Sequence, residues 1–152
     1  MKQNPILHKE ARFNYDIAET FEAGIELKGC EVKSIRRGQA NLKGSFARIT
    51  DNEVWLHNMH ISPYQFAAQE ARSLDPLRSR RLLLHRAQIK KLLVKLNQKG
   101  LTLIPTRVYF KRNMVKVELA LAQGKHLYDK REKIKKRELS RKLQRALKYK
   151  NT

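Results

Sequence analysis

The stretch that decides the fold is "LTLIPTRVYFKRNMVKVELALA", residues 101–122. Two strand-like halves with a turn at Lys111–Asn113 between them predict a β-hairpin. Pro105 indicates that the first strand is an edge strand or carries a bulge, because proline cannot donate to the ladder. Apolar residues at every second position give the second strand one buried face: Val115, Val117, Leu119 and Leu121.

Further extended segments lie towards the N-terminus. "SFARIT" (45–50) and "EVWLHNMHI" (53–61), joined by a turn at Asp51 and Asn52, predict a second hairpin. Alternation over residues 11–17 predicts a half-buried strand. "TFEAGIELKG" (20–29) predicts another extended segment, with Gly24 as a candidate bulge.

Short helices are expected between these strands. "CEVKSIRRG" (30–38) fits a brief helix that ends at Gly38, and the polar segment 65–80 reads as irregular with one helical turn. An amphipathic helix of about three turns, followed by Gly100, is indicated by i, i+3, i+4, i+7 spacing: Ile89, Leu92, Leu93 and Leu96. Roughly six antiparallel strands with short flanking helices predict a mainly β fold, an OB-like closed barrel.

Charge divides the chain into two parts. The whole sequence carries 34 Lys and Arg against 14 Asp and Glu, a net charge of +20, which favours a polyanionic partner. Residues 125–152 hold 12 of the basic residues and only three acids. We therefore expect an OB-like RNA-binding body over residues 1–123 and a basic tail over residues 124–152.

Several classes of function are disfavoured. No apolar run approaches the ~20 residues that span a bilayer, and the N-terminus does not resemble a signal peptide. Cys30 is the only cysteine, which is typical of a cytoplasmic protein. There is no P-loop, His57 and His60 would point to opposite faces of a strand, and no acid has a positioned partner. We expect no enzyme activity, no metal site and no cofactor, with Glu22, Glu26 and Glu31 as solvated or ion-paired surface acids.

The sequence of the tail predicts a helix that forms only when the tail is bound. Its three acids each precede a lysine by four residues, an arrangement that contributes about 0.2–0.5 kcal/mol per pair. A cationic ladder opposes this gain: Lys133, Arg137, Arg141 and Arg145. We predict a tail that is disordered when free and helical when docked on RNA. A merely solubilising tail, a membrane-surface helix and a helix for an acidic protein remain alternatives.

Several stretches together resemble the SsrA-binding protein family, also called small protein B: "ARFNYDI", "FEAGIELKGCEVKSIRRGQANL", "HISPY", "DPLRSRRLLLH", "GLTLIPTRVYF" and "GKHLYDKREKIKKR". The resemblance runs in order from about residue 6 to the end. It implies an OB-like barrel of six antiparallel strands that binds the tRNA-like domain of transfer-messenger RNA. It further implies delivery of that RNA to the vacant A site of a stalled ribosome, with the tail in the decoding centre and the empty mRNA channel.

The same resemblance implies roles for individual residues. Glu22 and Leu83 would hold the tRNA-like domain, with basic residues nearby as phosphate contacts; plain core packing is the alternative for Leu83. His8 and Glu10 depart from the residues usual before "ARF" in the family, which weakens the case for RNA contact there. The expected RNA-binding residues of the body are Glu22, Leu83, Lys33, Arg36, Arg80, Arg81, Arg12 and His8. Those of the ribosome-binding tail are Tyr128, Asp129, Lys130, Arg131, Ile134, Lys135 and Arg137.

The expected partners are transfer-messenger RNA and the stalled ribosome, bound by a monomer in the cytoplasm and without a membrane. The alternative function is a general tRNA- or ribosome-associated OB module whose cationic tail adds only non-specific affinity. Scrambling the tail at fixed composition separates the two, because purely electrostatic binding tolerates it.

Overall fold

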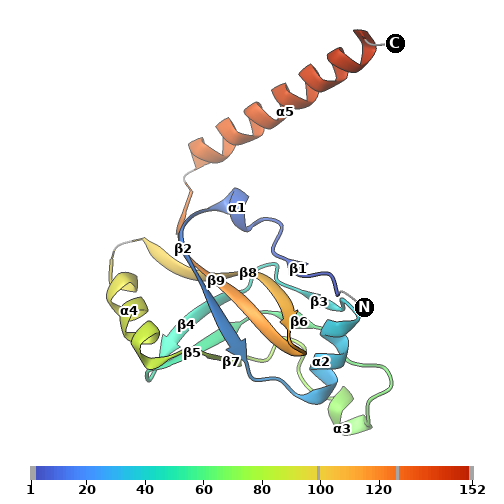
Figure 1. The fold of residues 1–152 in the computed structure, drawn as a ribbon, viewed down its shortest axis with the longest axis vertical. Coiled ribbons are helices and arrows are strands. Elements are labelled where there is room, and N and C mark those ends of the chain that lie inside the picture. Colours follow the sequence, from blue (N-terminus) through green and yellow to red (C-terminus); the bar gives the residue numbers. More distant parts are fainter. Residues whose placement is uncertain (1–2, 99, 126, 151–152) are drawn as a thin grey trace.

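The computed structural model describes residues 3–98, 100–125 and 127–150, with the side chains of residues 70 and 127–129 outside that description. Strands and helices gather into one body, from which the C-terminal helix projects (Figure 1). The elements in chain order are β1 (Ile6–Leu7), α1 (Ala11–Asn14), β2 (Tyr15–Ile25), α2 (Gly29–Arg36), β3 (Ala40–Asn41), β4 (Phe46–Thr50), β5 (Glu53–His57), β6 (His60–Ile61), α3 (Gln69–Arg72), β7 (Arg80–Leu83), α4 (Arg86–Leu96), β8 (Leu101–Lys111), β9 (Met114–Gly124) and α5 (Leu127–Lys150).

Six antiparallel strands close on themselves into a ring. They pair in the order β8–β4–β5–β7–β2–β9, and the pairing of β9 with β8 completes the circuit. Outside the ring, β1 pairs with β8, and β3 pairs with β6 in a separate two-stranded sheet. The prediction of a mainly β fold with about six antiparallel strands and short flanking helices is confirmed.

The hydrophobic core lies inside this ring. The four residues predicted for one face of β9 are buried there: Val115, Val117, Leu119 and Leu121. The helices add Ile35 from α2 and Leu92 from α4 to the same cluster, as the apolar spacing of both segments predicted. In Figure 1, α2 and α4 lie on opposite sides of the ring.

Both hairpin turns fall where the sequence places them. Asp51 and Asn52 have φ of 51° and 61°, and Arg112 and Asn113 have φ of 50° and 62°. Two successive left-handed residues match the right-handed twist of the flanking strands, which is why two-residue hairpins favour them. The turns therefore fix the registers of β4 with β5 and of β8 with β9.

Pro105 interrupts the β8–β9 ladder, as expected. The register of the two strands shifts between Pro105 and Arg107, because proline offers no N–H to the ladder. The bulge exposes backbone groups that the N-terminal segment uses. The amide of His8 donates to the carbonyl of Thr106 at 2.8 Å.

The predictions for residues 11–29 were partly wrong. Residues 11–14 form helix α1, in which Ala11 is buried against Ile104, Ala120 and Ala122 on the outer side of the β8–β9 hairpin. The small side chains of Ala11, Ala120 and Ala122 let a helical turn approach the strands. This tertiary packing outweighs the alternation of apolar and polar residues that predicted a strand here. The two expected strands are one strand, β2, and its irregularity lies between Ile17 and Glu19 instead of at Gly24.

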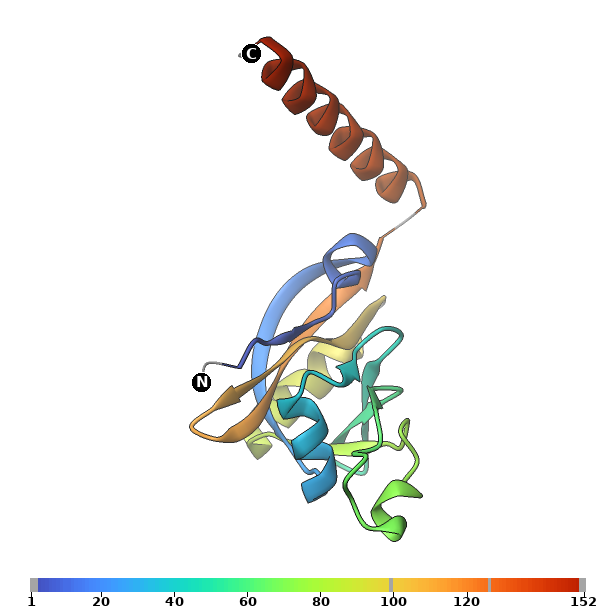
Figure 2. The same cartoon turned by 90° about the vertical axis from the view of Figure 1, so that its right-hand side faces the viewer.

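The tail is helical in this structure. β9 ends at Gly124, whose partner in β2 is Tyr15, and α5 follows from Leu127 to Lys150. Figure 2 shows α5 leading away from the body after leaving it beside α1. Over the described residues, no helix is long and apolar enough to cross a membrane.

Candidate nucleic-acid interface

Glu22 is the centre of a charged cluster on the outer face of the ring. Its carboxylate accepts a hydrogen bond from the Tyr109 hydroxyl, and its Oε1 lies 3.2 Å from Nζ of Lys111. Gly24, two residues further along β2, pairs with Lys116 of β9, and Lys116 pairs with Tyr109 of β8. Residues two apart on a strand share a face. The pairing therefore brings Glu22, Tyr109 and Lys116 to one side of the sheet.

The cluster sets the protonation of both partners. The hydrogen bond from Tyr109 lowers the pKa of Glu22 below its ordinary value, and the hydrogen bond and charge of Lys111 act in the same direction. Burial, and secondarily the hydrogen bond to Glu22, raises the pKa of Tyr109 to about 12. At neutral pH, Glu22 is thus an ionised acceptor held in place by a protonated phenol. A carboxylate in that state accepts hydrogen bonds from a base edge or a 2′-hydroxyl.

Leu83 adds an exposed apolar surface beside this carboxylate. It pairs with Gly24 across β2 and β7, and its side chain is 50% exposed. A Cβ atom on Gly24 would lie only 3.2 Å from the Cβ of Leu83, so the glycine leaves room for the leucine on the outer face. Leu83 is therefore not a core residue, and its alternative reading as core packing is wrong.

Arg81 lies on the outer face, but Arg80 does not. On β7, Leu83 and Arg81 alternate with the buried Arg80 and Leu82. The Arg81 guanidinium bonds Glu26 at 2.9 Å and Glu53 at 3.1 Å and remains accessible at the surface.

The expectation that Arg80 contacts RNA phosphate is contradicted. The side chain is 1% exposed and pairs with Glu31, which is buried as well. Arg80 also donates to the carbonyls of Met59 at 2.7 Å and Pro76 at 3.0 Å. Burial lowers the pKa of Arg80, and the hydrogen bond and charge of Glu31 oppose that effect. Arg80 is therefore a structural cation, and Glu31 is not the surface acid that we expected.

Lys33 and Arg36 of α2 are exposed and lie over different aromatic rings. The Arg36 guanidinium lies 5.5 Å from the ring of Phe110, which packs against the core on the face of β8 opposite Lys111. The Lys33 ammonium lies 5.4 Å from the ring of Tyr64 in the loop after β6. Lys33 and Arg36, the two expected phosphate contacts, thus lie on two different parts of the surface.

His8 and Arg12 lie on the segment before β2. Nδ1 of His8 is 2.8 Å from the carbonyl oxygen of Pro105, so this nitrogen donates the hydrogen bond. The carbonyl of Arg12 accepts from Lys125 at 3.0 Å and from Lys133 at 2.8 Å. His8 therefore belongs to the bulge in β8, and Arg12 belongs to the junction with the tail.

The first turns of the tail contact α1. Besides Lys133 on the Arg12 carbonyl, the Arg137 guanidinium lies 5.7 Å from the ring of Phe13. The pKa of Lys133 is lowered, first by the neighbouring ammonium of Lys125 and next by partial burial. The helix thus begins against the body with a crowded pair of cations.

Beyond those turns the tail is exposed to solvent. Ile134, an expected ribosome contact, is 43% exposed, and the leucines at spacing i, i+4 are 58–63% exposed: Leu139, Leu143 and Leu147. Lys130, Arg131 and Lys135 lie in the first half of α5, and the side chains of Tyr128 and Asp129 fall outside the described residues.

Sequence reasoning missed three members of the interface. Tyr109, Lys111 and Lys116 lie on the outward face of the β8–β9 hairpin, whereas the prediction from sequence concerned only the inward face of its second strand, as a buried face. The alternation of the strands held the signal, since every second residue faces out. Within the described ranges, no group of three or more His, Cys, Asp and Glu side chains could hold a metal ion.

Comparisons with known proteins agree over almost the whole chain. The family model described as SmpB protein matches residues 6–149. The SsrA-binding protein of Trichodesmium erythraeum (strain IMS101) is 59% identical over 141 residues, which cover 93% of this chain and 90% of the relative. That of Caldanaerobacter subterraneus subsp. tengcongensis is 56% identical over 143 residues, 94% of this chain and 89% of the relative.

A solved structure gives the same result. The chain is similar to one described as "tmRNA-SmpB: a journey to the center of the bacterial ribosome", with a TM-score of 0.67 and 48% identity. The match covers 81% of this chain and 85% of the other. Since both the family model and the relatives span nearly all of its length, the chain belongs to the SmpB family of SsrA-binding proteins.

Proposed function

We propose that this protein binds the tRNA-like domain of transfer-messenger RNA and carries it to the vacant A site of stalled ribosomes in trans-translation. Relatives that share more than half of its residues are named SsrA-binding proteins, and the similar solved structure is a tmRNA–SmpB assembly on the bacterial ribosome. One observation carries the proposal at the level of residues. The ionised Glu22 and the exposed Leu83 lie next to each other on an outer face that also bears Lys111 and Lys116.

Binding by the body combines three kinds of contact. Glu22 accepts hydrogen bonds from a base edge or a 2′-hydroxyl, and Leu83 packs against a splayed base. The cations of the face position the phosphate backbone, which supplies affinity without sequence information. Lys111 and Tyr109 hold the carboxylate in place, so little side-chain entropy is lost when RNA binds. No step of this mechanism breaks a covalent bond, and we assign the protein no enzyme activity.

The tail, residues 124–152, acts as a separate functional part from the body, residues 1–123. We propose that it is disordered before docking and enters the decoding centre and the empty mRNA channel as the helix of this structure. Its 24 residues in α5 span about 36 Å at 1.5 Å per residue. Ribosomal phosphates would neutralise the ladder Lys133, Arg137, Arg141 and Arg145, whose self-repulsion opposes a free helix.

Two further features belong to the same proposal. The closed ring of six strands is OB-like, an architecture that presents one face to oligonucleotides. A ribosomal site of action places the protein in the cytoplasm, as a monomer bound to its RNA.

The body is tested by Glu22→Gln. The matched control is Glu19→Gln on the same strand, where the carboxylate pairs with Lys95 outside the interface. Glu22→Gln should weaken binding to transfer-messenger RNA at physiological salt, because a neutral amide accepts a weaker hydrogen bond than a carboxylate. Glu19→Gln should not. Equal affinity of both variants would remove Glu22 from the site.

The tail is tested by replacing Asp129, Lys130 and Arg131 together by Ala. This variant should bind transfer-messenger RNA normally and fail to tag the products of stalled ribosomes. Normal tagging by the triple variant would contradict the proposed role of the tail.

A further inference from the structure

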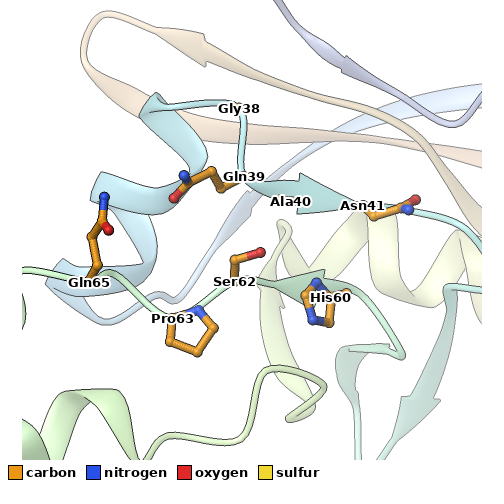
Figure 3. Close-up of a pocket in the computed structure, with 8 residues that line it drawn as sticks. All are labelled: Gly38, Gln39, Ala40, Asn41, His60, Ser62, Pro63 and Gln65. Carbon is orange, nitrogen blue, oxygen red and sulfur yellow. The ribbon is translucent and has the colours of Figure 1, made fainter.

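A polar hollow of about 440 Å³ lies between the end of α2, the small β3–β6 sheet and the loop that follows β6 (Figure 3). We propose that this hollow, together with an aromatic pair at its rim, binds one unstacked nucleotide of single-stranded RNA. The proposal rests on the proposed RNA-binding function and adds a nucleotide subsite to it. The volume lies within the range of about 300–1,000 Å³ that is usual for small-ligand sites.

The rim offers a stacking surface under positive charge. The rings of Tyr64 and Phe66 have their centroids 5.7 Å apart in an edge-to-face arrangement, and Phe66 is 70% exposed. The Arg37 guanidinium lies 5.2 Å from both rings, and Lys33 lies 5.4 Å from that of Tyr64. The exposed Phe66, packed against the half-buried Tyr64 beside two cations, suits a nucleotide, since the base stacks on a ring and the phosphate meets the charges.

The hollow itself suits a base edge. Gln39, Asn41 and Gln65 supply amide donors and acceptors, and Ser62 and His60 add a hydroxyl and an imidazole. Figure 3 shows these side chains coming from both sides, with Gln39 just before β3 and Asn41 in it, and His60 in β6 and Ser62 just after it. Among the described lining residues there is no Lys, Arg, Asp or Glu. The phosphate of the nucleotide therefore binds near Arg37 and Lys33 at the rim, and its uncharged base binds inside the hollow.

The walls are held in place by the fold. The Ser34 hydroxyl donates to the carbonyl of Ser62 at 2.7 Å, and the amide of Ser62 donates to the carbonyl of Gln39 at 3.0 Å. Gly38, with φ of 72°, turns the chain sharply from α2 into β3. Gly38 is flanked in the sequence by Arg37 at the rim and Gln39 in the wall. In the same way, Gln65 in the wall lies in the sequence between the rim residues Tyr64 and Phe66. Rim and hollow are thus adjacent parts of one preorganised site.

The direct test is NMR on the full-length protein with nucleoside 5′-monophosphates and, separately, ribose 5-phosphate. Nucleotides should shift the side-chain amides of Gln39 and Gln65 and the ring protons of Tyr64 and Phe66. Ribose 5-phosphate should leave the ring protons in place, because it carries the charge without a base. Equal shifts with both probes, or none with nucleotides, would overturn the proposal.

Variants extend the test to the natural RNA. Phe66→Ala should lower the affinity for transfer-messenger RNA by roughly 5- to 150-fold, the usual range for loss of one stacked base. Phe66→Tyr should restore the affinity, and Val94→Ala on α4, also at an exposed apolar residue, should not change it. If transfer-messenger RNA binds but Phe66→Ala has no effect, the nucleotide subsite fails and the proposed function stands. If the RNA itself does not bind while nucleotides still shift these resonances, the proposed function fails and the subsite stands.

Discussion

The hydroxyl of Tyr109 donates a hydrogen bond to the carboxylate of Glu22, reaching from β8 over β9 to β2. The two residues are 87 positions apart in the sequence, and the pairing of β2 with the β8–β9 hairpin brings them together. The bond lowers the pKa of the carboxyl group below its ordinary value and fixes the direction of the carboxylate on the outer face. The orientation of this carboxylate is therefore set by the fold itself.

Tyr109→Phe should raise the pKa of Glu22 towards its ordinary value of 4.5, because the hydrogen bond from Tyr109 is the largest cause of its lowering. A carboxyl carbon titration by NMR measures the change. Lys111→Gln, which removes the second donor, should shift the pKa in the same direction by less. An unchanged Glu22 titration in Tyr109→Phe would show that the bond does not control ionisation.

The same variant should have a pH-dependent effect on stability. A carboxyl whose folded pKa is lowered stabilises the fold above its unfolded pKa, and this contribution is lost as pH falls through the folded value. The parent should therefore be more stable than Tyr109→Phe at neutral pH, with the difference shrinking below about pH 4.5. Thermal melts at pH 7 and pH 3 would show it. A difference that grew at acid pH would contradict this sign.

Leu83→Ala should weaken RNA binding without unfolding the protein. The side chain is half exposed beside Gly24, so its removal leaves no cavity in the core. Its neighbour is the matched control: Leu82→Ala should cost about 2–5 kcal/mol of unfolding free energy, because Leu82 is buried. Denaturant unfolding and RNA titration separate the two effects. A large stability loss in Leu83→Ala would place this residue in the core.

Arg80→Ala should destabilise the fold by about 3–5 kcal/mol, since it breaks a buried ion pair and leaves the Glu31 carboxylate to the partly exposed Arg78. Arg81→Ala, at the next residue, should change stability by less than about 1 kcal/mol, as is usual for exposed pairs. The effects on RNA binding should be the opposite of those on stability. In RNA titrations, Arg81→Ala should lose affinity and folded Arg80→Ala should retain it. Equal melting temperatures for the two variants would contradict the assignment.

Scrambling residues 125–152 at fixed composition should leave the salt dependence of RNA binding nearly unchanged, because the number of cations is the same. Tagging on stalled ribosomes should nevertheless fail, since the order of residues sets which side chains α5 presents. Amide NMR of the free parent protein should show little helix in this segment, with helix forming on docking. Full rescue by the scrambled protein would support the general RNA-binding module.

The elements that were predicted correctly depend on local patterns. The turn residues Asp51–Asn52 and Arg112–Asn113, the spacing of Ile89 and Leu92, and Gly38 after α2 act within a few residues of the chain. Residues 11–14 were predicted wrongly because their conformation depends on the small residues of β8 and β9 against which Ala11 packs. Alternation alone could not reveal that surface.

The sequence by itself determined the paired hairpins, the split between a mixed body and a basic tail, and, through its motifs, the family. Only the tertiary structure decided which of the expected RNA-binding side chains lie on the outer face and which are buried. Arg80 and Arg81 are chemically identical neighbours. Successive residues of a strand point to opposite faces, but the strand alone does not determine which face is inward. Pairing of β7 with β2 and β5 settles that choice, and Glu31, 49 positions away, buries one arginine while the other stays at the surface.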